Sequence, residues 1–425
     1  MLGLALLVVA FVVGYFIYQR SVSYAHPDGS APADRIDAVA SEDGSIELRY
    51  AGSSASRAGT LPVLRLAGTP AMIGAAQGRL LGPELLDAVR PFATAIAATV
   101  PPGGWFGGIS RGMRLRWRHR FVDDGIPGHQ LVEIANVLRG TASGGDAVPD
   151  YEDFVRAHAA LDIGIAAPGA TEPRSRVVAR SLSFVAPLRG PSGDRLLVGR
   201  SFAMPGLGDG GDAAARTATV SFVRPDGVIA FASVGWPGQV GVVSGINAEG
   251  IAVMVHPVRA SDVRASRSAQ PVALLARDIL ENAHTLDEAI SVLEHNAPLG
   301  AAAFVIVDGT ARQWAVVERS PTRIAISRNP TAPAVTDLLT GDPFAEDPEN
   351  DWTRRIAPAA MRGKRAAQLL RGPLDDVAAA AAILRDRRST SDAALPPGHR
   401  GAIDDPAAAV ALFDASGMVL WVAEG

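Results

Sequence analysis

Two short strings in this sequence match patterns that carry chemistry in other proteins. Residues 206–211 (GLGDGG) have the glycine spacing of a dinucleotide-binding loop, and residues 108–112 (GISRG) have the serine spacing of a hydrolase nucleophile elbow. The first pattern must follow a strand directly, but Pro205 precedes it and acidic, alanine-rich residues follow it. The second needs a buried strand before its serine, which the Pro- and Gly-rich residues 101–105 do not provide. We therefore interpret the first string as a loop and the second as a chance match.

The scarcity of cysteine and lysine removes several other kinds of chemistry. The chain has no cysteine, which excludes disulfides, thiolate metal sites and a cysteine nucleophile. Its single lysine, Lys364, is followed by arginine, so a phosphate-binding P-loop is excluded, and Schiff-base chemistry would depend on this one residue. No pair among the eight histidines has the spacing of helical metal ligands, and we interpret them as surface or packing residues. We predict neither a metal site nor a nucleotide cofactor.

The overall composition is that of a globular protein with an apolar bias. Of the 425 residues, 48% are hydrophobic and 20% are charged, and the formal net charge is −4. A chain of this length forms one large domain or two ordinary ones. The slightly negative charge gives no indication of a nucleic-acid partner.

The N-terminus carries an unbroken apolar run, residues 2–18, which ends at Gln19 and Arg20. A run of this length spans most of the hydrocarbon core of a bilayer. It is either a retained signal anchor or a secretory signal that is cut after Ala25, leaving His26 as the new N-terminus. Its length and the lack of a preceding positive charge favour the anchor.

We therefore predict a transmembrane anchor at residues 1–20 and a flexible linker at 21–58, with a short strand-like segment at 45–50. The translocation-type segment and the absence of cysteine lead us to expect a single-pass membrane protein. Its domain, residues 59–425, is expected to lie outside the cytoplasm.

This domain is expected to have a helical first part and a β-rich second part. Thr69 and Pro70 are typical of a helix start, and helical periodicity covers residues 131–139 and 151–161. Beyond residue 176, short β-rich runs alternate with turns, and helix pairs interrupt them, which predicts an α+β layered fold with two sheets. The expected strands are 177–188, 195–203, 217–223, 228–234, 239–246, 251–255, 302–307, 313–318, 323–327, 408–413 and 418–422; the expected helices are 272–283, 286–296, 354–370 and 374–385.

Several strings spread over residues 61–425 together resemble the isopenicillin-N acyltransferase family, which includes acyl-CoA:6-aminopenicillanic acid acyltransferases and related linear-amide hydrolases. The most specific string is residues 235–253 (GWPGQVGVVSGINAEGIAV). The resemblance continues in residues 68–78, 133–154, 181–184, 199–203, 286–289 and 308–309.

The resemblance implies the N-terminal-nucleophile (Ntn) hydrolase fold, an αββα four-layer sandwich, with a propeptide-like helical part at 59–180 and the main sandwich at 181–425. Members of this family cut themselves before the nucleophile, and the freed α-amine, which titrates near about pH 8, then acts as the base. Ser181 aligns with the nucleophile and Arg200 with the family's arginine. Asp337 stands where an asparagine would hold the oxyanion. Asn247, within the most specific string, is either a substrate-binding residue or a turn residue in a left-handed conformation.

The sequence departs from the family pattern at several of these positions. The nucleophile is serine rather than cysteine, and Ala203 replaces an acidic residue. Asp337 would place a negative charge where an oxyanion develops, unless the carboxyl group is protonated. Arg180, before the bond that would be cut, is bulkier than the small residue usual in the family.

Two functional classes therefore stay open. In the first, the protein is a membrane-tethered hydrolase or acyltransferase that acts on a small amide or acyl substrate, with Ser181 as nucleophile and Arg200 positioning the substrate. In the second, it is a catalytically inactive relative that serves as a binding or scaffold domain, which the residues at 203 and 337 favour.

Overall fold

The computed structural model describes residues 2–28, 34–40, 45–98, 100, 107–165, 180–190, 194–203, 218–265, 268–356, 358–396, 399, 401–404 and 408–424. The loop-like string at 206–211 lies outside these residues. The string at 108–112 lies within a helix, α4 (Gly107–Arg118), and therefore does not form the strand–turn–helix of a nucleophile elbow.

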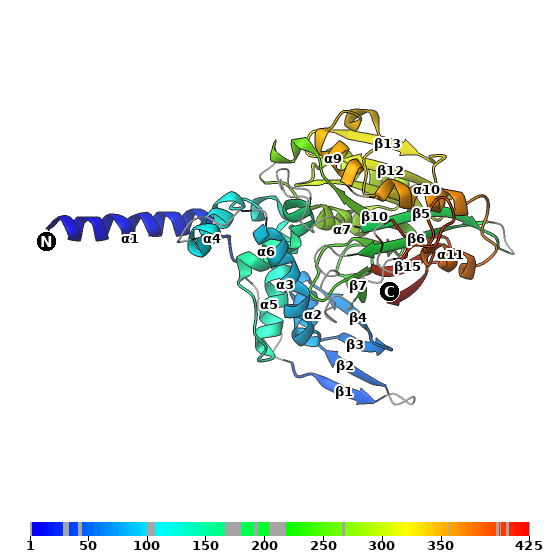
Figure 1. Cartoon of the computed structure of the whole chain (residues 1–425). Coiled ribbons are helices and arrows are strands. Elements are labelled where there is room, and N and C mark those ends of the chain that lie inside the picture. Colours follow the sequence, from blue (N-terminus) through cyan, green and yellow to red (C-terminus); the bar gives the residue numbers. More distant parts are fainter. Residues whose placement is uncertain are drawn as a thin grey trace.

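The described residues contain two sheets (Figure 1). The larger has eleven strands in the order β1-β2-β3-β4-β7-β8-β9-β10-β11-β12-β13. Its pairs are antiparallel except β4 with β7, which run parallel. Its strands are β1 (Asp37–Ala40), β2 (Ile46–Tyr50), β3 (Ser53–Ala58), β4 (Leu61–Gly68), β7 (Thr219–Pro225), β8 (Phe231–Gly235), β9 (Ser244–Asn247), β10 (Ile251–Val258), β11 (Ala301–Asp308), β12 (Gln313–Arg319) and β13 (Ile324–Arg328).

The smaller sheet has five strands in the order β14-β5-β6-β15-β16. Its members are β14 (Ala334–Thr336), β5 (Arg180–Leu188), β6 (Arg195–Ala203), β15 (Ala408–Asp414) and β16 (Val419–Glu424). The predicted pairing of residues 181–188 with 195–203 is confirmed, because β5 and β6 are antiparallel neighbours with Ser181 opposite Phe202. The expected closing hairpin is confirmed as β15 and β16.

The two sheets face each other and helices cover their outer faces, which confirms the expected αββα layering. Val185 and Phe413 of the small sheet pack in one core with Met254 and Val305 of the large sheet. Helices α7 (Val272–Asn282) and α8 (Leu286–His295) bury their apolar side chains against the other face of the large sheet. Helices α10 (Ala359–Leu369) and α11 (Val377–Leu384) cover the other face of the small sheet, and α9 (Pro348–Ile356) precedes them.

The helical part before β5 consists of α2 (Pro70–Leu80), α3 (Gly82–Ala98), α4, α5 (Gly128–Ser143) and α6 (Tyr151–His158). Thr69 caps α2 as expected, since its side chain accepts a hydrogen bond from the Met72 N–H. Helix α4 was not expected from the sequence. Its arginine- and glycine-rich sequence has few apolar residues with helical spacing.

The N-terminal helix α1 (Leu2–Val22) projects from the body of the molecule (Figure 1). It is long and apolar enough to cross a membrane by length and composition, a test that signal sequences also pass. The strand-like segment expected at 45–50 is confirmed as β2, but the expected flexible linker at 21–58 is wrong in part, because β1 and β3 also extend the large sheet within it. Strand β3 consists mostly of serine and alanine, so its sequence lacks the apolar alternation typical of a strand. Its pairing with β4 compensates for the low β-propensity of these residues.

Candidate active site

Ser181 and Ser183 lie on β5 and point into the space between the two sheets. Side chains alternate along a strand, and Leu182 and Phe184 pack against the helices on the outer face. The two serines therefore share the inner face with Val185, which belongs to the core between the sheets. Both are buried, which requires hydrogen-bonding partners for their hydroxyl groups.

Arg200 lies on β6 directly opposite Ser183, and its guanidinium is fully buried. Nη1 lies 3.1 Å from Ser183 Oγ, Nε donates to Ser244 Oγ at 3.2 Å, and Nη2 donates to the Val255 carbonyl at 2.5 Å. Burial lowers the pKa of Arg200 to about 9, partly offset by the charge of Asp337. The arginine therefore stays charged at neutral pH and ties β6 to β9 and β10.

His256 approaches the serines from the other sheet. It shares the inner face of β10 with Met254, which packs between the sheets. Its Nδ1 lies 2.8 Å from Ser181 Oγ, and its Nε2 lies 2.8 Å from Ser183 Oγ and 2.9 Å from Arg200 Nη1. Burial and the charge of Arg200 lower the pKa of His256 to about 4, so the imidazole is neutral at neutral pH.

Asp337, just beyond β14, accepts hydrogen bonds from two atoms of Ser181. Its Oδ2 accepts the Ser181 backbone N–H at 2.8 Å, and its Oδ1 accepts the Ser181 hydroxyl. Arg362 of α10 donates to Oδ2 at 2.9 Å. Burial raises the pKa of Asp337, but the nearby His256 and the charge of Arg362 outweigh this and lower it overall. The carboxylate is therefore ionised at neutral pH.

The partners of His256 indicate which ring nitrogen carries the proton. Arg200 Nη1 can only donate, so His256 Nε2 accepts from it and the proton resides on Nδ1. The Nδ1–H then donates to Ser181 Oγ, whose own proton points to Asp337. The distance from His256 Nδ1 to Asp337 Oδ1 is 3.9 Å. In this arrangement Asp337, rather than His256, is the group placed to accept the serine proton.

The structure brings Ser181, Arg200 and Asp337 together but gives Asn247 different partners. The Asn247 side-chain amide donates to the carbonyls of Leu280 and Ala283, and its oxygen accepts the N–H groups of Glu249 and Ile251. Asn247 thus closes the turn between β9 and β10. The left-handed conformation suggested for it is wrong, because Gly250 rather than Asn247 has the positive φ in that turn.

Sequence reasoning missed four members of this cluster: Ser183, Ser244, His256 and Arg362. One signal was available for His256, since a histidine within the apolar strand 251–258 must be buried and needs polar partners. Ala203 lies opposite Arg180 at the start of β5, next to the bond before Ser181. It has no polar group to offer that bond.

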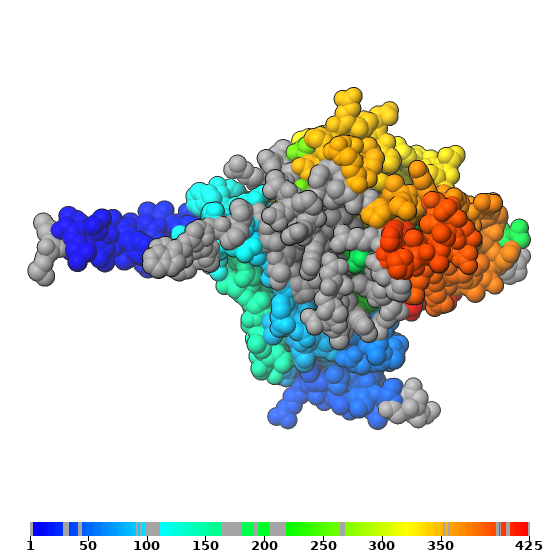
Figure 2. All heavy atoms as spheres, viewed as in Figure 1, coloured from blue at the N-terminus to red at the C-terminus, as the bar shows by residue number. Residues whose placement is uncertain are grey.

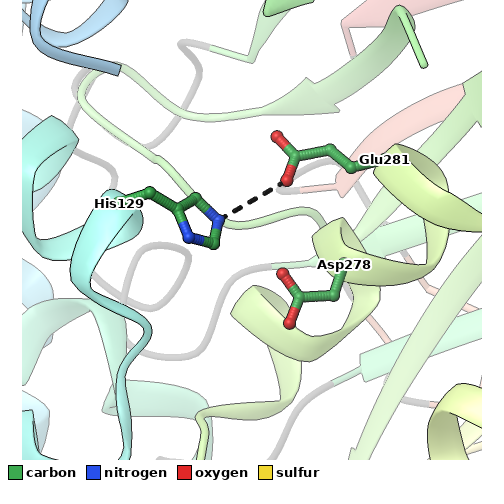
Figure 3. A group of neighbouring side chains, drawn as sticks. All are labelled: His129, Asp278 and Glu281. Atoms are coloured by element: carbon green, nitrogen blue, oxygen red, sulfur yellow. Dashed lines mark ion pairs between the residues drawn. The ribbon is translucent and has the colours of Figure 1, made fainter. Parts of the chain in front are cut away.

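A second cluster of polar side chains joins α5 to α7. His129, Asp278 and Glu281 place one potential ligand atom each within 4.8 Å of one another (Figure 3). Their oxygens already have protein partners, because Asp278 accepts Gln130 and Gln270 amides at 2.7 Å each and Glu281 accepts Arg277 at 2.8 Å. His129 Nε2 lies 3.7 Å from Glu281 Oε2, and the neighbouring Glu281 raises the pKa of His129. These contacts describe an ion-pair network between two helices.

Comparison with known proteins gives one relative of uncharacterised function. A protein of Archaeoglobus fulgidus is 26% identical over 274 residues, which is 62% of this chain and 44% of that protein. The chain thus spans less than half the length of this relative.

Similar solved structures include three amide hydrolases. The Caenorhabditis elegans orthologue of N-acylethanolamine-hydrolyzing acid amidase has a TM-score of 0.40 at 14% identity, covering 57% of this chain and 99% of that one. Penicillin V acylase from Agrobacterium tumefaciens has 0.35 at 17%, covering 57% and 83%. A mutant conjugated bile acid hydrolase from Clostridium perfringens has 0.38 at 12%, covering 57% and 89%. At these TM-scores the likeness carries no argument about function.

The family model described as acyl-coenzyme A:6-aminopenicillanic acid acyl-transferase matches residues 212–425, just over half of the chain. His256, Asp337 and Arg362 lie within the matched residues, whereas Ser181 and Arg200 precede them. The strings quoted from residues 235–253, 286–289 and 308–309 fall inside the same match. The chain therefore belongs to the acyl-coenzyme A:6-aminopenicillanic acid acyl-transferase family.

Proposed function

We propose that this protein is a membrane-tethered Ntn hydrolase or acyltransferase for linear amides, which activates itself by cutting between Arg180 and Ser181. The observation that carries the proposal is the Asp337 carboxylate, which accepts both the hydroxyl and the backbone N–H of Ser181. One acceptor thus contacts the two atoms that must exchange an acyl group during self-cleavage. An inactive scaffold domain would not need this arrangement.

Self-cleavage begins with the attack of Ser181 Oγ on the carbonyl carbon of Arg180. Asp337 takes the hydroxyl proton and then gives it to the Ser181 nitrogen as the C–N bond breaks, which returns Asp337 to its ionised form. The resulting ester joins the Arg180 acyl group to Ser181 Oγ. Water hydrolyses this ester, which leaves a carboxylate on Arg180 and a free α-amine on Ser181.

Catalysis on an external amide uses the same atoms. The α-amine takes the proton of Ser181 Oγ, and the oxygen attacks the carbonyl carbon of the substrate to form an acyl-enzyme while the amine product leaves. Water releases the acyl group as an acid, whereas an amine acceptor receives it in a new amide. The enzyme is a hydrolase if water accepts the acyl group, and an acyltransferase if an amine accepts it.

The charges around Ser181 compensate for the carboxylate at position 337. Arg200 and Arg362 carry two positive charges against the single negative charge of Asp337. The cluster is therefore net positive, which favours an oxyanion on the attacked carbonyl. We propose that Arg200 acts mainly by positioning Ser183 and His256, since its guanidinium is committed to protein partners.

Amine tagging tests this proposal directly, because the chain has so few amines. Besides its N-terminus, the intact chain has one amine, on Lys364, and cleavage adds only the α-amine of Ser181. We expect an amine-reactive tag on Ser181 in the wild type and none there in Ser181→Ala. A wild-type protein in which only the N-terminus and Lys364 react would support the inactive scaffold class instead.

We propose further that α1 is retained as a membrane anchor, with the domain outside the cytoplasm. Tyr24, just after α1, is 3% exposed, and its hydroxyl donates to the His119 carbonyl at 2.6 Å. The Arg156 guanidinium lies 5.5 Å from the centre of its ring. Cleavage after Ala25 would remove Tyr24 from the core of the domain, which supports a retained anchor over a cleaved signal.

Alkaline carbonate extraction separates these interpretations. An anchored chain stays with the membrane pellet and keeps its original N-terminus. Release into the soluble fraction with His26 as the first residue would show that the segment is a cleaved signal.

A further inference from the structure

Helix α4 lies at the base of α1 and is rich in arginine. Its sequence from Gly107 to Arg118 is GGISRGMRLRWR, and Arg120 follows in the next turn. Figures 1 and 2 show α4 beside the point where α1 enters the body of the molecule. The sequence of residues 107–118 contains no aspartate or glutamate.

Specific contacts fix α4 against α1. The Tyr18 hydroxyl donates to the Met113 carbonyl at 2.7 Å, and the rings of Tyr18 and Trp117 stack with their centres 6.4 Å apart. The Arg120 guanidinium lies 4.1 Å from the centre of the Trp117 ring. These contacts set Trp117 at the level of Tyr18, the residue at which the apolar run of α1 ends.

The exposed face of α4 combines large apolar and basic side chains. Met113 is 40% exposed and Trp117 48% exposed, although both are large apolar residues. Arg114 and Arg118 are exposed beside them, one residue further along in each case. Since residues four apart lie on the same side of a helix, the four side chains form one surface. We call this surface, made by Met113, Arg114, Trp117 and Arg118, the α4 face.

We propose that the α4 face docks on the surface of the bilayer that α1 crosses and binds anionic lipid headgroups; this inference rests on the proposed membrane anchor. Tryptophan and tyrosine prefer the boundary between hydrocarbon and headgroups, and the stacked pair lies where α1 leaves its apolar run. Arginine binds phosphate groups with paired hydrogen bonds. A helix with an aromatic and basic face at this depth has the composition of an interfacial helix.

Two nearby acidic side chains pair with arginines outside the α4 face. Asp150 lies 3.6 Å from Arg116, which is on the side of α4 turned towards the domain. Arg156 faces inwards and binds Asp153. Docking of the α4 face would hold the domain at a fixed height and tilt, because Val22 and Tyr24 continue directly from α1 into the buried core.

The absence of native cysteine makes a direct test possible in the full-length chain. Single cysteines replace Met113 on the α4 face, Val9 in α1, or Met361 on α10, which is 38% exposed and serves as the matched control. Each is spin-labelled and placed in nanodiscs with zwitterionic or anionic lipid. Accessibility to a water-soluble nickel chelate and to oxygen reports the depth of the label.

We expect the label at 113 to be protected from the nickel chelate several-fold relative to the label at 361, and more strongly with anionic lipid. Equal accessibility at 113 and 361, with the label at 9 protected, would overturn the docking proposal and leave the anchor intact. Accessibility at position 9 as well would overturn the anchor, and the docking proposal with it. Equal protection in both lipids would contradict the binding of anionic headgroups.

A charge variant tests the role of the arginines separately. In the Met113→Cys background, Arg114→Gln with Arg118→Gln should abolish the extra protection given by anionic lipid. The matched control is Arg354→Gln with Arg355→Gln, which changes two exposed arginines of α9. This control should leave the extra protection given by anionic lipid unchanged. Salt at about 1 M, where the screening length is about 3 Å, should mimic the first variant. If the variant with Arg114→Gln and Arg118→Gln is still protected more strongly by anionic lipid, the proposal is contradicted.

Discussion

At the scale of single residues, the proposed self-cleavage depends on Asp337. An asparagine would hold an oxyanion with its amide, but a carboxylate cannot do so while it is ionised. The hydrogen bonds to Ser181 indicate a different use, in which the carboxylate accepts the hydroxyl proton. Arg362 then keeps the buried charge paired, as a buried carboxylate requires.

Replacing Asp337 should therefore block self-cleavage without removing the fold. We expect Asp337→Asn to slow cleavage before Ser181 by about 100-fold or more, since general-base catalysis contributes about 100- to 10,000-fold. Denaturing gel electrophoresis over a time course measures the rate. Asp347→Asn, which also removes a buried carboxylate paired with arginine but lies outside the cluster, is the matched control and should cleave normally. Cleavage of Asp337→Asn at the wild-type rate would exclude Asp337 as the base.

His256 should make the protein less stable in acid. Its pKa is about 4 in the folded state against about 6.5 when unfolded, so the unfolded state gains its proton first as the pH falls. The free energy of unfolding should fall from about pH 6.5 to about pH 4, with a contribution of about 3 kcal/mol from this residue. His119 and His158 are also buried with lowered pKa values, so the wild type must be compared with His256→Gln.

Chemical denaturation at pH 7 and pH 4 measures this difference. The variant should lose less stability between the two pH values than the wild type does. Parallel curves for the two proteins would show that His256 does not titrate in this way.

The sequence indicated part of this site, and the missing part has a physical reason. The resemblance singled out Ser181, Arg200 and Asp337, which the structure brings into one hydrogen-bonded cluster; their catalytic roles stay predictions. His256 belongs to a strand more than seventy positions from Ser181, and local patterns do not reveal that two strands of different sheets face each other. Asn247 lies in the most specific string because a turn needs its side chain.

At the scale of elements, two glycines allow a pair of helices to cross closely. Helices α2 and α5 cross so closely that a Cβ at Gly78 would lie 1.9 Å from the Val137 carbonyl oxygen. A Cβ at Gly140 would lie 2.2 Å from the Ala75 carbonyl oxygen. The sequence predicted α2 from its start at Thr69 and Pro70 and α5 from its periodicity, but the close crossing that these glycines permit is visible only in the structure.

Gly78→Ala should destabilise the protein, although alanine normally favours a helix. Overpacking at a tight contact costs about 1–3 kcal/mol, which outweighs a gain of about 1 kcal/mol in helix propensity. Gly112→Ala on α4 is the matched control, because no atom lies within 4 Å of the new Cβ, and it should stabilise slightly. Thermal unfolding of both variants measures the effects. A Gly78→Ala protein as stable as the control would contradict the packing described.

At the scale of the whole molecule, self-cleavage would divide the chain without dividing the fold. The segment before Ser181 supplies β1 to β4 and the segment after it supplies β7 to β13, all within one sheet. Strands β4 and β7 pair in parallel across this division. Glu133 and Arg277 add two buried hydrogen bonds of 2.7 Å between the segments.

The two products should therefore stay together as one particle. Size-exclusion chromatography in mild detergent should give a single peak that contains both fragments, and only a denaturant should separate them. Breaking a buried ion pair costs about 3–5 kcal/mol, so Glu133→Gln should lower the denaturant concentration at which they separate. Elution of the fragment 181–425 alone from native protein would contradict the shared sheet.

The mass of the purified protein under denaturing conditions shows directly whether the chain is cut before Ser181. Ser181 can act as an N-terminal nucleophile only if the bond before it is broken, because its α-amine does not exist in the intact chain. We predict two fragments that meet between Arg180 and Ser181 in the wild type, and a single intact chain in Ser181→Ala. A wild type that remains one intact chain of 44.1 kDa would contradict it.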